Sequence, residues 1–404
     1  MSRSGGMDAK VVIVGASAGG VSAAEALRAR GHTGPIELIG AEKHAPYDRP
    51  PLSKQLLKGE LLASDVALRA STHLRDLNVA ERFGVAATAL NTKARTVTLA
   101  DGTNTDYDRV IIATGVSARQ LPIRNSVGGV HTLRTLDEAV ALQSAIADAK
   151  RVVVVGGGFL GTEIAAAAVA LGVDVVLAGK ASTLLEGALG ATVGEQVAGL
   201  HTSRGVELMT GPAATVHQLR VKDGQVTGVE FRSGEFVQAD LVILAVGSEP
   251  AVDWLRSSSL SLTDGVDCSS DCSAGEGIYA VGDVARWHNP LFNVSMRIEH
   301  RTNATDQAIH VAERILNGDT TAYAPVPYFW SDQFDVKIQA HGYLRGHDEV
   351  KVIEGSLDDG RMIAIYRTGG TLTGVVAVGA AKALRQWRGH VATKMDWHDA
   401  ISLS

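Results

Sequence analysis

The sequence predicts an α/β fold in which one strand–turn–helix unit occurs twice. Each copy is a short run of β-branched residues that breaks into glycine and continues as a helix-forming segment, at 10–28 and again at 151–168. Such a turn points backbone N–H groups and the positive end of a helix dipole at one place, which suits a pyrophosphate. Two copies in one chain of 404 residues therefore predict two bound dinucleotides.

The glycine loops differ at one of the three glycine positions of the G-x-G-x-x-G pattern. The first follows the pattern G-x-S-x-x-G and the second G-x-G-x-x-G; the residues expected at the phosphates are Gly15, Ser17, Gly19 and Gly20 in the first loop, and Gly156, Gly158, Phe159, Leu160 and Gly161 in the second. Serine is the smallest substitute that still lets the backbone approach a phosphate. One such loop is a weak signal because glycine turns also serve packing, whereas two in register are much stronger.

The repeat extends beyond the loops. Each copy continues into a meander with hairpin signals, Asp101-Gly102 and Asp223-Gly224, and then into an apolar strand that ends in glycine, at 108–115 and 240–247. One more strand at 277–283 ends in Gly282-Asp283. If this strand returns to the first copy, the second nucleotide domain is inserted within the first.

The last eighty residues have a different pattern. After Pro325-Val326-Pro327, alternating segments at 350–353, 362–366 and 372–378 read as strands, and 380–391 reads as a helix. We therefore expect a third, α+β domain.

Composition excludes several classes of protein. The chain is 45% apolar and 20% charged, as is usual for globular proteins, and its net charge of −6 predicts no attraction to nucleic acid. The longest apolar stretch, 164–173, is about half a membrane span, and residues 1–6 lack the apolar core of a signal peptide. We expect a cytoplasmic protein with no membrane partner.

The only two cysteines, Cys268 and Cys272, are spaced neither as C-x-x-C nor as part of a four-ligand metal set. We expect both to be small residues of a strand and loop near the surface. The histidines include no H-E-x-x-H, so no metal site is predicted.

Five ordered blocks add to the loops, at 46–54, 133–136, 279–286, 297–300 and 327–334. Together these features resemble the FAD-dependent NAD(P)H:ferredoxin reductases, of the putidaredoxin reductase and dioxygenase-reductase-component type, over nearly the whole chain. The resemblance implies a glutathione-reductase-like fold: two Rossmann-type nucleotide-binding domains and a C-terminal α+β domain. It implies an FAD domain at 1–114 and 247–324, an NAD(P) domain at 115–246 and the C-terminal domain at 325–404.

The resemblance also implies an FAD site. Besides the first loop, its residues would be Ala41, Glu42, Arg49, Lys54, Ala87, Thr114, Gly115, Arg134, Gly282, Asp283, Glu299, His300, Arg301 and Trp330. Asp283 would accept a hydrogen bond from the ribityl chain. Ala41 stands where the family often has an acid for the adenosine ribose, with Glu42 next to it. Arg301 replaces an aromatic residue common in part of the family.

For the nicotinamide coenzyme the resemblance adds Glu163, Gly179, Lys180 and Gly247 to the second loop. Glu163, which we expect in the first helical turn, resembles the family glutamate near the nicotinamide; otherwise it complements the helix dipole. NAD sites usually place an acid about twenty residues beyond the loop, but here the strand ends in Gly179-Lys180. Without that acid a 2′-phosphate is tolerated, so the sequence allows either NADH or NADPH as the coenzyme.

A nicotinamide gives up two electrons as hydride, whereas a two-iron ferredoxin accepts one at a time. FAD between them performs the conversion, and the protein aligns the partners. By position, Glu163, Glu299, Lys54 and Trp330 are the expected catalytic residues, although Trp330 also suits a hydrophobic core. The ferredoxin would supply a monooxygenase or a Rieske dioxygenase, and the reductase would be a monomer or weak homodimer.

The expected ferredoxin surface is basic. It comprises Arg286, Arg297 and Arg301, together with Lys382, Arg385 and Arg388 along one face of the last helix. An ordinary solvated face is the other interpretation.

Three related activities compete. A disulfide reductase needs a cysteine pair after the first loop or in the second nucleotide domain, and neither segment has a cysteine. An NAD(P)H oxidase often keeps one cysteine after the second strand, but 40–54 has none. A binding role, as in apoptosis-inducing flavoproteins, stays open until turnover is measured.

Overall fold

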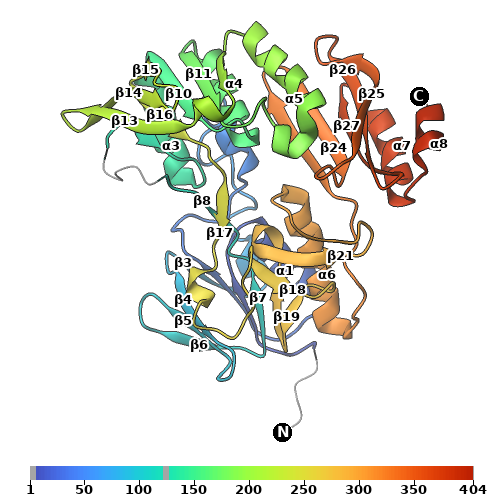
Figure 1. Cartoon of the computed structure of the whole chain (residues 1–404). Helices are drawn as coiled ribbons and strands as arrows, with labels where there is room; N and C mark the ends of the chain where they lie inside the picture. Colours follow the sequence, from blue (N-terminus) through green and yellow to red (C-terminus); the bar gives the residue numbers. More distant parts are fainter. Residues whose placement is uncertain (1–5, 122–126, 404) are drawn as a thin grey trace. The chain divides into compact units, whose positions relative to one another are not determined.

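The computed structural model describes residues 6–121 and 127–403, so most of the segment weighed as a signal peptide lies outside it. The chain divides into two compact units (Figure 1). The first comprises residues up to Asp48, Val66–Ser117 and Glu249–Pro325; the second comprises Arg49–Asp65, Ala118–Ser248 and Val326–Ser404. The chain passes between them within the paired strands β8 (Val116–Ala118) and β17 (Ser248–Pro250).

The first unit is built on a six-stranded sheet with β1 near its centre. In spatial order its strands are β19 (Ser273–Gly275), β20 (Ile278–Ala280), β7 (Arg109–Ile112), β1 (Val11–Val14), β2 (Ile36–Gly40) and β3 (Val79–Phe83). All but β19 run parallel, because β1 pairs parallel with β2 and β7, and β20 pairs parallel with β7. The strand predicted at 277–283 therefore joins this sheet.

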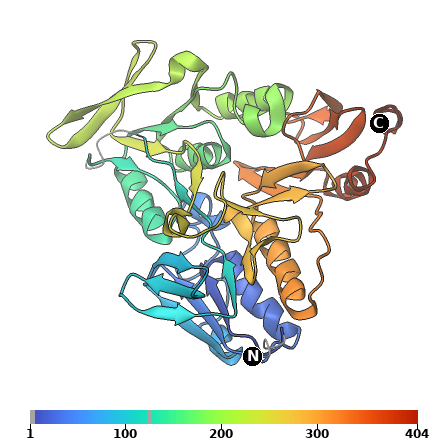
Figure 2. The same ribbon diagram turned by 60° about the horizontal axis from the view of Figure 1, so that its bottom comes forward.

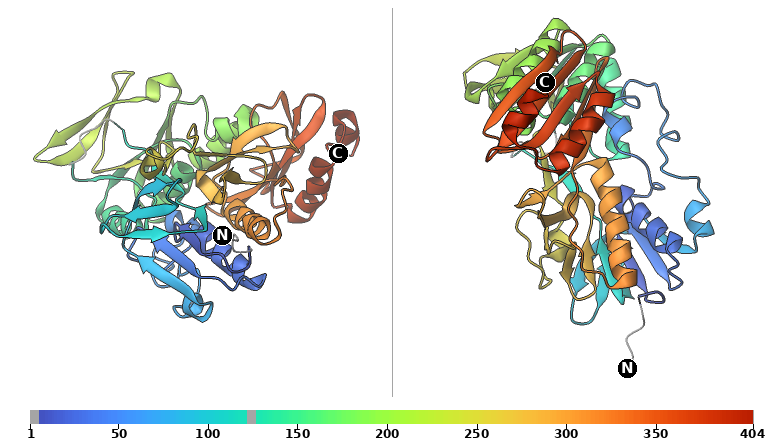
Figure 3. Two further views of the ribbon diagram at one scale, coloured as in Figure 1. Left: turned by 90° about the horizontal axis from the view of Figure 1, so that it is seen from below. Right: turned by 90° about the vertical axis from the view of Figure 1, so that its right-hand side faces the viewer.

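Two helices of the first unit, α1 (Ala18–Ala29) and α6 (Arg301–Asn317), pack side by side against the sheet (Figure 3). In α6 the buried residues recur every three to four positions, from Asn303 to Ile315, and face α1 and the short turn η4 (Gly282–Val284). Smaller elements complete the unit: α2 (His73–Asp76), η3 (Asp253–Leu255) and the sheet of β18 (Val266–Cys268), β21 (Ala285–Asn289) and β22 (Val294–Arg297).

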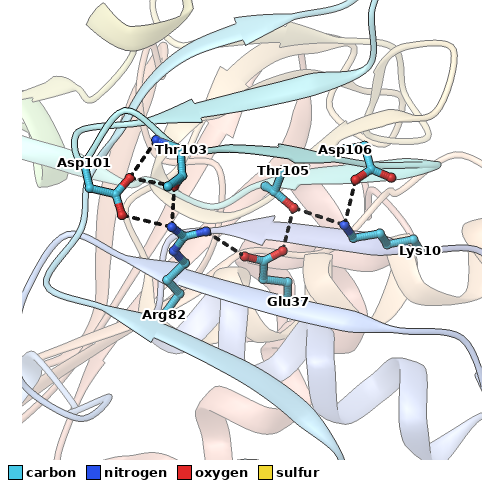
Figure 4. A network of polar contacts seen from close by, with 7 residues as sticks. All are labelled: Lys10, Glu37, Arg82, Asp101, Thr103, Thr105 and Asp106. Carbon is cyan, nitrogen blue, oxygen red and sulfur yellow. Dashed lines mark hydrogen bonds and ion pairs between the residues drawn. The ribbon is translucent and has the colours of Figure 1, made fainter.

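The predicted meander of this unit is β4 (Ala87–Asn91), β5 (Thr96–Leu99) and β6 (Asn104–Asp106). A network of Lys10, Glu37, Arg82, Asp101, Thr103, Thr105 and Asp106 ties it to the six-stranded sheet (Figure 4). Thr105 Oγ1 donates to Glu37 Oε2 at 2.6 Å, and Arg82 Nη2 lies 2.9 Å from Asp101 Oδ2. Because Asp101 and Asp106 are exposed, water screens their ion pairs, and the network connects the meander to the sheet rather than supplying much stability.

The second unit carries a five-stranded parallel sheet. In spatial order its strands are β12 (Glu207–Thr210), β11 (Asp174–Gly179), β10 (Arg151–Val155), β16 (Leu241–Leu244) and β9 (Val130–His131). Its helices are α3 (Leu136–Asp148), α4 (Phe159–Ala170) and α5 (Glu186–Ser203). The predicted meander is present as β13 (Val216–Lys222), β14 (Gln225–Phe231) and β15 (Phe236–Gln238), with the β13/β14 hairpin extended at one side (Figure 2).

The last residues form an antiparallel sheet that also belongs to the second unit. Its order is β23 (Tyr328–Gln333), β24 (Val336–Gly342), β27 (Thr371–Val378), β26 (Arg361–Thr368) and β25 (Glu349–Ser356). Helix α7 (Ala381–Ala392) packs on this sheet, followed by α8 (Trp397–Ser402) (Figure 3). The three predicted strands and the helix at 380–391 are present. The strands β23 and β24 were not predicted, because the buried residues of β23 include Ser331 and Gln333 rather than apolar side chains.

Residues 49–65 pack with the second unit through the turn η1 (Pro50–Ser53), which contacts α3 and α4. Among residues 6–121 and 127–403, no helix combines the length and apolarity needed to cross a membrane.

Candidate active site

The first glycine loop has the geometry of an anion site. Gly15 has φ +119°, and a Cβ there would collide with the carbonyl oxygen of Ala113. A Cβ on Gly20 would collide with the carbonyl oxygen of Gly15. Ser17 is the N-cap of α1 but makes no side-chain cap, and the first turn holds no acid. The helix N-terminus therefore suits a phosphate.

The second loop repeats this geometry residue for residue. Gly156 has φ +125° and faces the carbonyl oxygen of Ala245, and a Cβ on Gly161 would collide with the carbonyl oxygen of Gly156. Gly158, the N-cap of α4, has φ −84° and open space where a Cβ would stand. The equivalent position of the first loop is Ser17, at φ −107°, so its departure from glycine does not disturb the turn.

Two other predicted FAD residues of the first unit, Gly282 and Asp283, lie in η4. Gly282 has φ +72°, and its N–H donates to Gln307 Oε1 at 2.8 Å. Asp283 is half-buried, and its carbonyl oxygen accepts from Arg297 Nη1 at 3.1 Å. Gln307, fully buried on α6, was not predicted; a buried amide on a helix has no distinguishing sequence signal.

Thr114 and Gly115 close the third strand of the first repeat. Thr114 Oγ1 donates to the carbonyl oxygen of Ala251 at 2.9 Å, and Gly115 has φ +68°. Ala87 opens β4 and packs against the hydrophobic core of the first unit.

The residues expected at the adenosine ribose follow β2. Ala41 is exposed, whereas Glu42 is half-buried and accepts a hydrogen bond from the Tyr47 hydroxyl at 2.5 Å. Glu42 is thus the first carboxylate in the chain after the end of β2 at Gly40.

Three expected residues lie at the start of α6. Glu299 is exposed and accepts from Arg297 Nη1 at 2.7 Å. His300 is the N-cap of α6. Arg301 Nε lies 2.5 Å from Asp48 Oδ1, and its Nη1 donates to Thr305 Oγ1 at 2.8 Å.

The second unit holds a buried ion pair. Lys54 Nζ lies 2.9 Å from Glu163 Oε2, and the two side chains are 10% and 9% exposed. Ser53 Oγ donates to the same oxygen at 2.6 Å, and Ser331 Oγ donates to Oε1 at 2.7 Å. Every one of these neighbours donates to the Glu163 carboxylate, so it serves only as an acceptor.

The expectation that Glu163 lies in the first helical turn is wrong. Helix α4 begins at Phe159, so Glu163 is its fifth residue and faces the protein interior. Its partner Lys54 follows Pro50-Pro51, which fix the turn η1. The pairing with Lys54, rather than the helix dipole, stabilises this carboxylate.

Two predicted arginines lie in one part of the second unit. Arg49 is the N-cap of η1, and its Nη1 donates to the carbonyl oxygen of Arg134. Arg134 precedes a capping box: Glu138 Oε2 accepts from the N–H groups of Arg134 and Thr135 at 2.7 and 2.9 Å. The T-x-x-E pattern at 135–138 is a signal from which this helix start could have been predicted.

Aromatic side chains gather on β23. Trp330 is half-buried and stacks on Tyr328 with 6.1 Å between ring centroids. Phe159, at the start of α4, meets Phe329 edge-on at 5.0 Å, and Leu160 beside it is half-buried.

The end of β11 has no acid, as the sequence indicates. Lys180 is exposed, and a Cβ on Gly179 would lie 3.2 Å from the backbone nitrogen of Gly157. Gly247, beyond β16, has φ +102° and is exposed.

The placement expected for the cysteines is wrong for Cys272. Its side chain is fully buried, and its sulfur accepts from Gln307 Nε2 at 3.2 Å. Burial raises the pKa of Cys272 well above its usual value and that of Cys268 to about 12. Both thiols are therefore poor nucleophiles.

The predicted basic surface is present only in part. Arg286 pairs with Asp267 at 2.9 Å, Arg297 with Asp264 at 3.1 Å, and Arg301 with Asp48. These carboxylates offset the arginine charges. On α7, by contrast, Lys382, Arg385 and Arg388 are exposed, opposite the buried Leu384, Trp387 and Val391.

Two glycine loops with the same backbone geometry, each leading into a helix N-terminus, are the features of a dinucleotide-binding protein. Residues 9–308 match the model of the pyridine nucleotide-disulphide oxidoreductases, and residues 328–401 match a reductase C-terminal domain. The chain therefore belongs to the pyridine nucleotide-disulphide oxidoreductase family.

Rhodocoxin reductase from Rhodococcus erythropolis is 34% identical, over 95% of this chain and 90% of that protein. The ferredoxin–NAD(+) reductase component of the anthranilate 1,2-dioxygenase system of Burkholderia cepacia is 37% identical, over 85% and 84%. The crystal structure of the covalent putidaredoxin reductase–putidaredoxin complex superimposes with a TM-score of 0.90 at 32% identity, over 96% of this chain and 94% of that one. The predicted fold class and family are confirmed.

Proposed function

We propose that this protein is an NAD(P)H:ferredoxin oxidoreductase that passes electrons from the nicotinamide coenzyme through FAD to a two-iron ferredoxin. The observation that carries the proposal is the occurrence of two glycine loops with the same backbone geometry in one chain. The family uses FAD and NAD(P)H, and the relatives named above serve ferredoxin-dependent systems. The ferredoxin supplies a monooxygenase or a Rieske dioxygenase.

In this proposal the domains are an FAD domain at 1–114 and 247–324, an NAD(P) domain at 115–246 and a C-terminal domain at 325–404. The two loops fit dinucleotides because their helix N-termini lack both a side-chain cap and an acid in the first turn. FAD, when bound, supplies the conversion of a hydride into single electrons.

The remaining roles belong to this chain's own residues. Gly15 and Gly20 would let the backbone approach the FAD pyrophosphate, and Asp283 would accept a hydrogen bond from the ribityl chain. Within the second unit, Lys54 holds the Glu163 carboxylate in place for the nicotinamide. Glu299 of the first unit and Trp330 of the second are each proposed to keep the role that the resemblance implies. The glycines of the second loop seat NADH or NADPH, and the other predicted contacts keep the roles given by the resemblance.

The proposed partner surface is the basic face of α7, formed by Lys382, Arg385 and Arg388. Charge complementarity with an acidic ferredoxin supports it. The protein is proposed to be a monomer or weak homodimer, because exposed large apolar residues such as Leu62 and Phe236 lie in separate segments. A cytoplasmic location fits the two free cysteines.

Purified protein tests the cofactor assignment. We expect a yellow protein that releases FAD on denaturation and whose flavin is bleached anaerobically by NADH or NADPH. A folded, colourless protein that does not take up FAD would refute the proposal. Rapid reoxidation by oxygen with no ferredoxin reduction would favour the oxidase alternative.

A further inference from the structure

A row of buried polar side chains connects Glu163 with helix α5. Ser331 Oγ donates to Glu163 Oε1 at 2.7 Å, and Gln333 Nε2 donates to Ser331 Oγ at 3.2 Å. His201 Nε2 lies 2.9 Å from Gln333 Oε1. Ser331, Gln333 and His201 are fully buried, and all four residues belong to the second unit. We call these four residues the Glu163 relay.

The hydrogen bonds of the Glu163 relay all run in one direction. The Gln333 amide nitrogen donates to Ser331, so its oxygen is the acceptor for His201, and His201 Nε2 must carry the hydrogen. The Ser331 hydroxyl accepts a hydrogen bond from Gln333 and donates its own hydrogen to Glu163. Burial lowers the pKa of His201, in keeping with a neutral ring. In the described part of the chain, His201 Nδ1 has no hydrogen-bond partner.

The relay occupies positions that apolar side chains would normally fill. Ser331 and Gln333 are two residues apart on β23, so both face the interior, and each needs a partner there. The turn after β23 is held against α5, because the rings of Phe334 and His201 meet edge-on at 5.0 Å and Arg204 Nη2 lies 2.6 Å from Asp335 Oδ1. The hairpin, and with it Ser331, is thus fixed relative to α5.

We propose that Ser331, Gln333 and His201 are positioning residues, which hold the Glu163 carboxylate in the orientation needed for hydride transfer. Lys54 and Ser53 fix Oε2, and the relay fixes Oε1, so the carboxylate is held at both oxygens. No proton or electron moves along the relay. The proposal rests on the proposed role of Glu163 beside the nicotinamide.

The kinetic test is Gln333→Met, which keeps the side-chain length but removes both hydrogen bonds. The Ser331 hydroxyl is then free to rotate away from Glu163. In stopped-flow measurements on the FAD-loaded protein, we expect the limiting rate of flavin reduction by NADH or NADPH to fall about fivefold, with a smaller change in coenzyme Kd. His201→Gln, which retains a donor, should lose less than His201→Leu.

The matched control is Gln196→Met. Gln196 lies on α5, and its Oε1 accepts from the backbone N–H of Leu357, so this variant also removes a glutamine hydrogen bond between α5 and the C-terminal segment. It lies outside the relay and should reduce flavin at the wild-type rate. An equal slowing in both glutamine variants would overturn the proposal in favour of a general packing effect.

A second readout is independent of turnover. Long-range proton–nitrogen NMR of histidine-labelled protein, with His201 assigned from His201→Gln, should show a neutral ring protonated on Nε2. This signal should change in Gln333→Met and stay unchanged in Gln196→Met. A ring protonated on Nδ1 would overturn the one-way relay.

Glu163→Gln separates this inference from the proposed function. If that variant reduces flavin at the wild-type rate, the role of Glu163 in the proposed function is wrong. If Glu163→Gln is slow while Gln333→Met matches wild type, only the relay proposal is overturned. We expect the double variant to be no slower than Glu163→Gln alone, since both changes act through one carboxylate.

Discussion

Lys54 Nζ and Glu163 Oε2 lie 2.9 Å apart although the two residues are 109 positions apart in the chain. Both side chains are about one-tenth exposed, so each charge has lost most of its hydration. The attraction between the two charges compensates for that loss. The pair joins η1 to α4 within the second unit and fixes the carboxylate proposed to face the nicotinamide.

Removing one member of this pair should destabilise the protein. For Lys54→Met we expect the free energy of unfolding to fall by about 3–5 kcal/mol, because the Glu163 carboxylate stays buried without its cation. Urea unfolding measures this. The control is Lys58→Met: Lys58 pairs with Glu60 at 2.8 Å, but Glu60 is 52% exposed, so the loss should be about 1 kcal/mol or less. Similar losses in the two variants would contradict the buried-pair account.

Positions within a glycine loop should differ in how well they tolerate a side chain. Gly156→Ala should abolish coenzyme binding or destabilise the second unit, because Cβ meets the Ala245 carbonyl and φ is +125°. The Gly158→Ser variant should bind coenzyme nearly as well as wild type. A Cβ at position 158 would meet no neighbouring atom, and the equivalent residue of the first loop is Ser17. Titration of protein fluorescence with NADH and NADPH tests both. Loss of binding in Gly158→Ser would refute the equivalence of the loops.

Coenzyme preference should respond to a carboxylate at the end of β11. For Gly179→Glu we expect a shift in kcat/KM towards NADH of at least about tenfold, which is about 1.4 kcal/mol, because the new charge repels a 2′-phosphate. Gly179→Ala is the control, since it adds the same Cβ, 3.2 Å from Gly157, without the charge. A wild-type preference for NADH of several thousandfold would contradict the argument from Gly179 and Lys180.

Ferredoxin reduction should depend on the charge of α7. With Arg385→Glu and Arg388→Glu together, reduction of the ferredoxin at low salt should slow, while FAD binding and dye reduction stay intact. Salt should slow the wild type in the same way, because the Debye length falls from about 10 Å at 0.1 M to about 3 Å at 1 M. Lys222→Glu, on the exposed edge of β13, is the control. Unchanged ferredoxin kinetics in the double variant would remove α7 from the docking surface.

Stability should fall in mild acid because of His341. Burial, followed by the charge of Arg388, lowers its pKa to about 4, and its ring packs on Tyr328 with centroids 4.8 Å apart. The unfolded chain binds a proton near pH 6.5 and the folded one only near pH 4. The stability that comes from keeping the buried His341 ring neutral is therefore fully present above pH 6.5. It is lost as the pH falls from 6.5 through 4. His341→Phe should lose less free energy of unfolding than wild type between pH 7 and 4; equal losses would contradict this assignment.

The repeat and the loops could be predicted from sequence because their chemistry is local. Gly15, Gly156 and the glycines that follow them are needed by backbone geometry within a few residues, so the pattern itself carries the signal. The meanders likewise follow from hairpin signals in the chain.

The interior polar contacts could not be predicted in this way. Glu163 meets Ser331 across 168 positions, and His201 meets Gln333 across 132, and a polar residue inside a strand or helix gives no local signal of its partner. The same polar residues break the alternation of β23, which is why that strand was missed. Arg286, Arg297 and Arg301, which the sequence predicts to belong to a basic surface, are each paired with a carboxylate that only the fold brings near.

Single-turnover electron transfer tests the central proposal most directly. FAD-loaded protein would be mixed anaerobically with NADH or NADPH and then with an oxidised two-iron ferredoxin from a monooxygenase or dioxygenase system. We expect the flavin absorbance to bleach first and the ferredoxin spectrum to change next, with two ferredoxins reduced per coenzyme oxidised. A flavin that bleaches but reduces only oxygen, and no two-iron ferredoxin, would contradict the account.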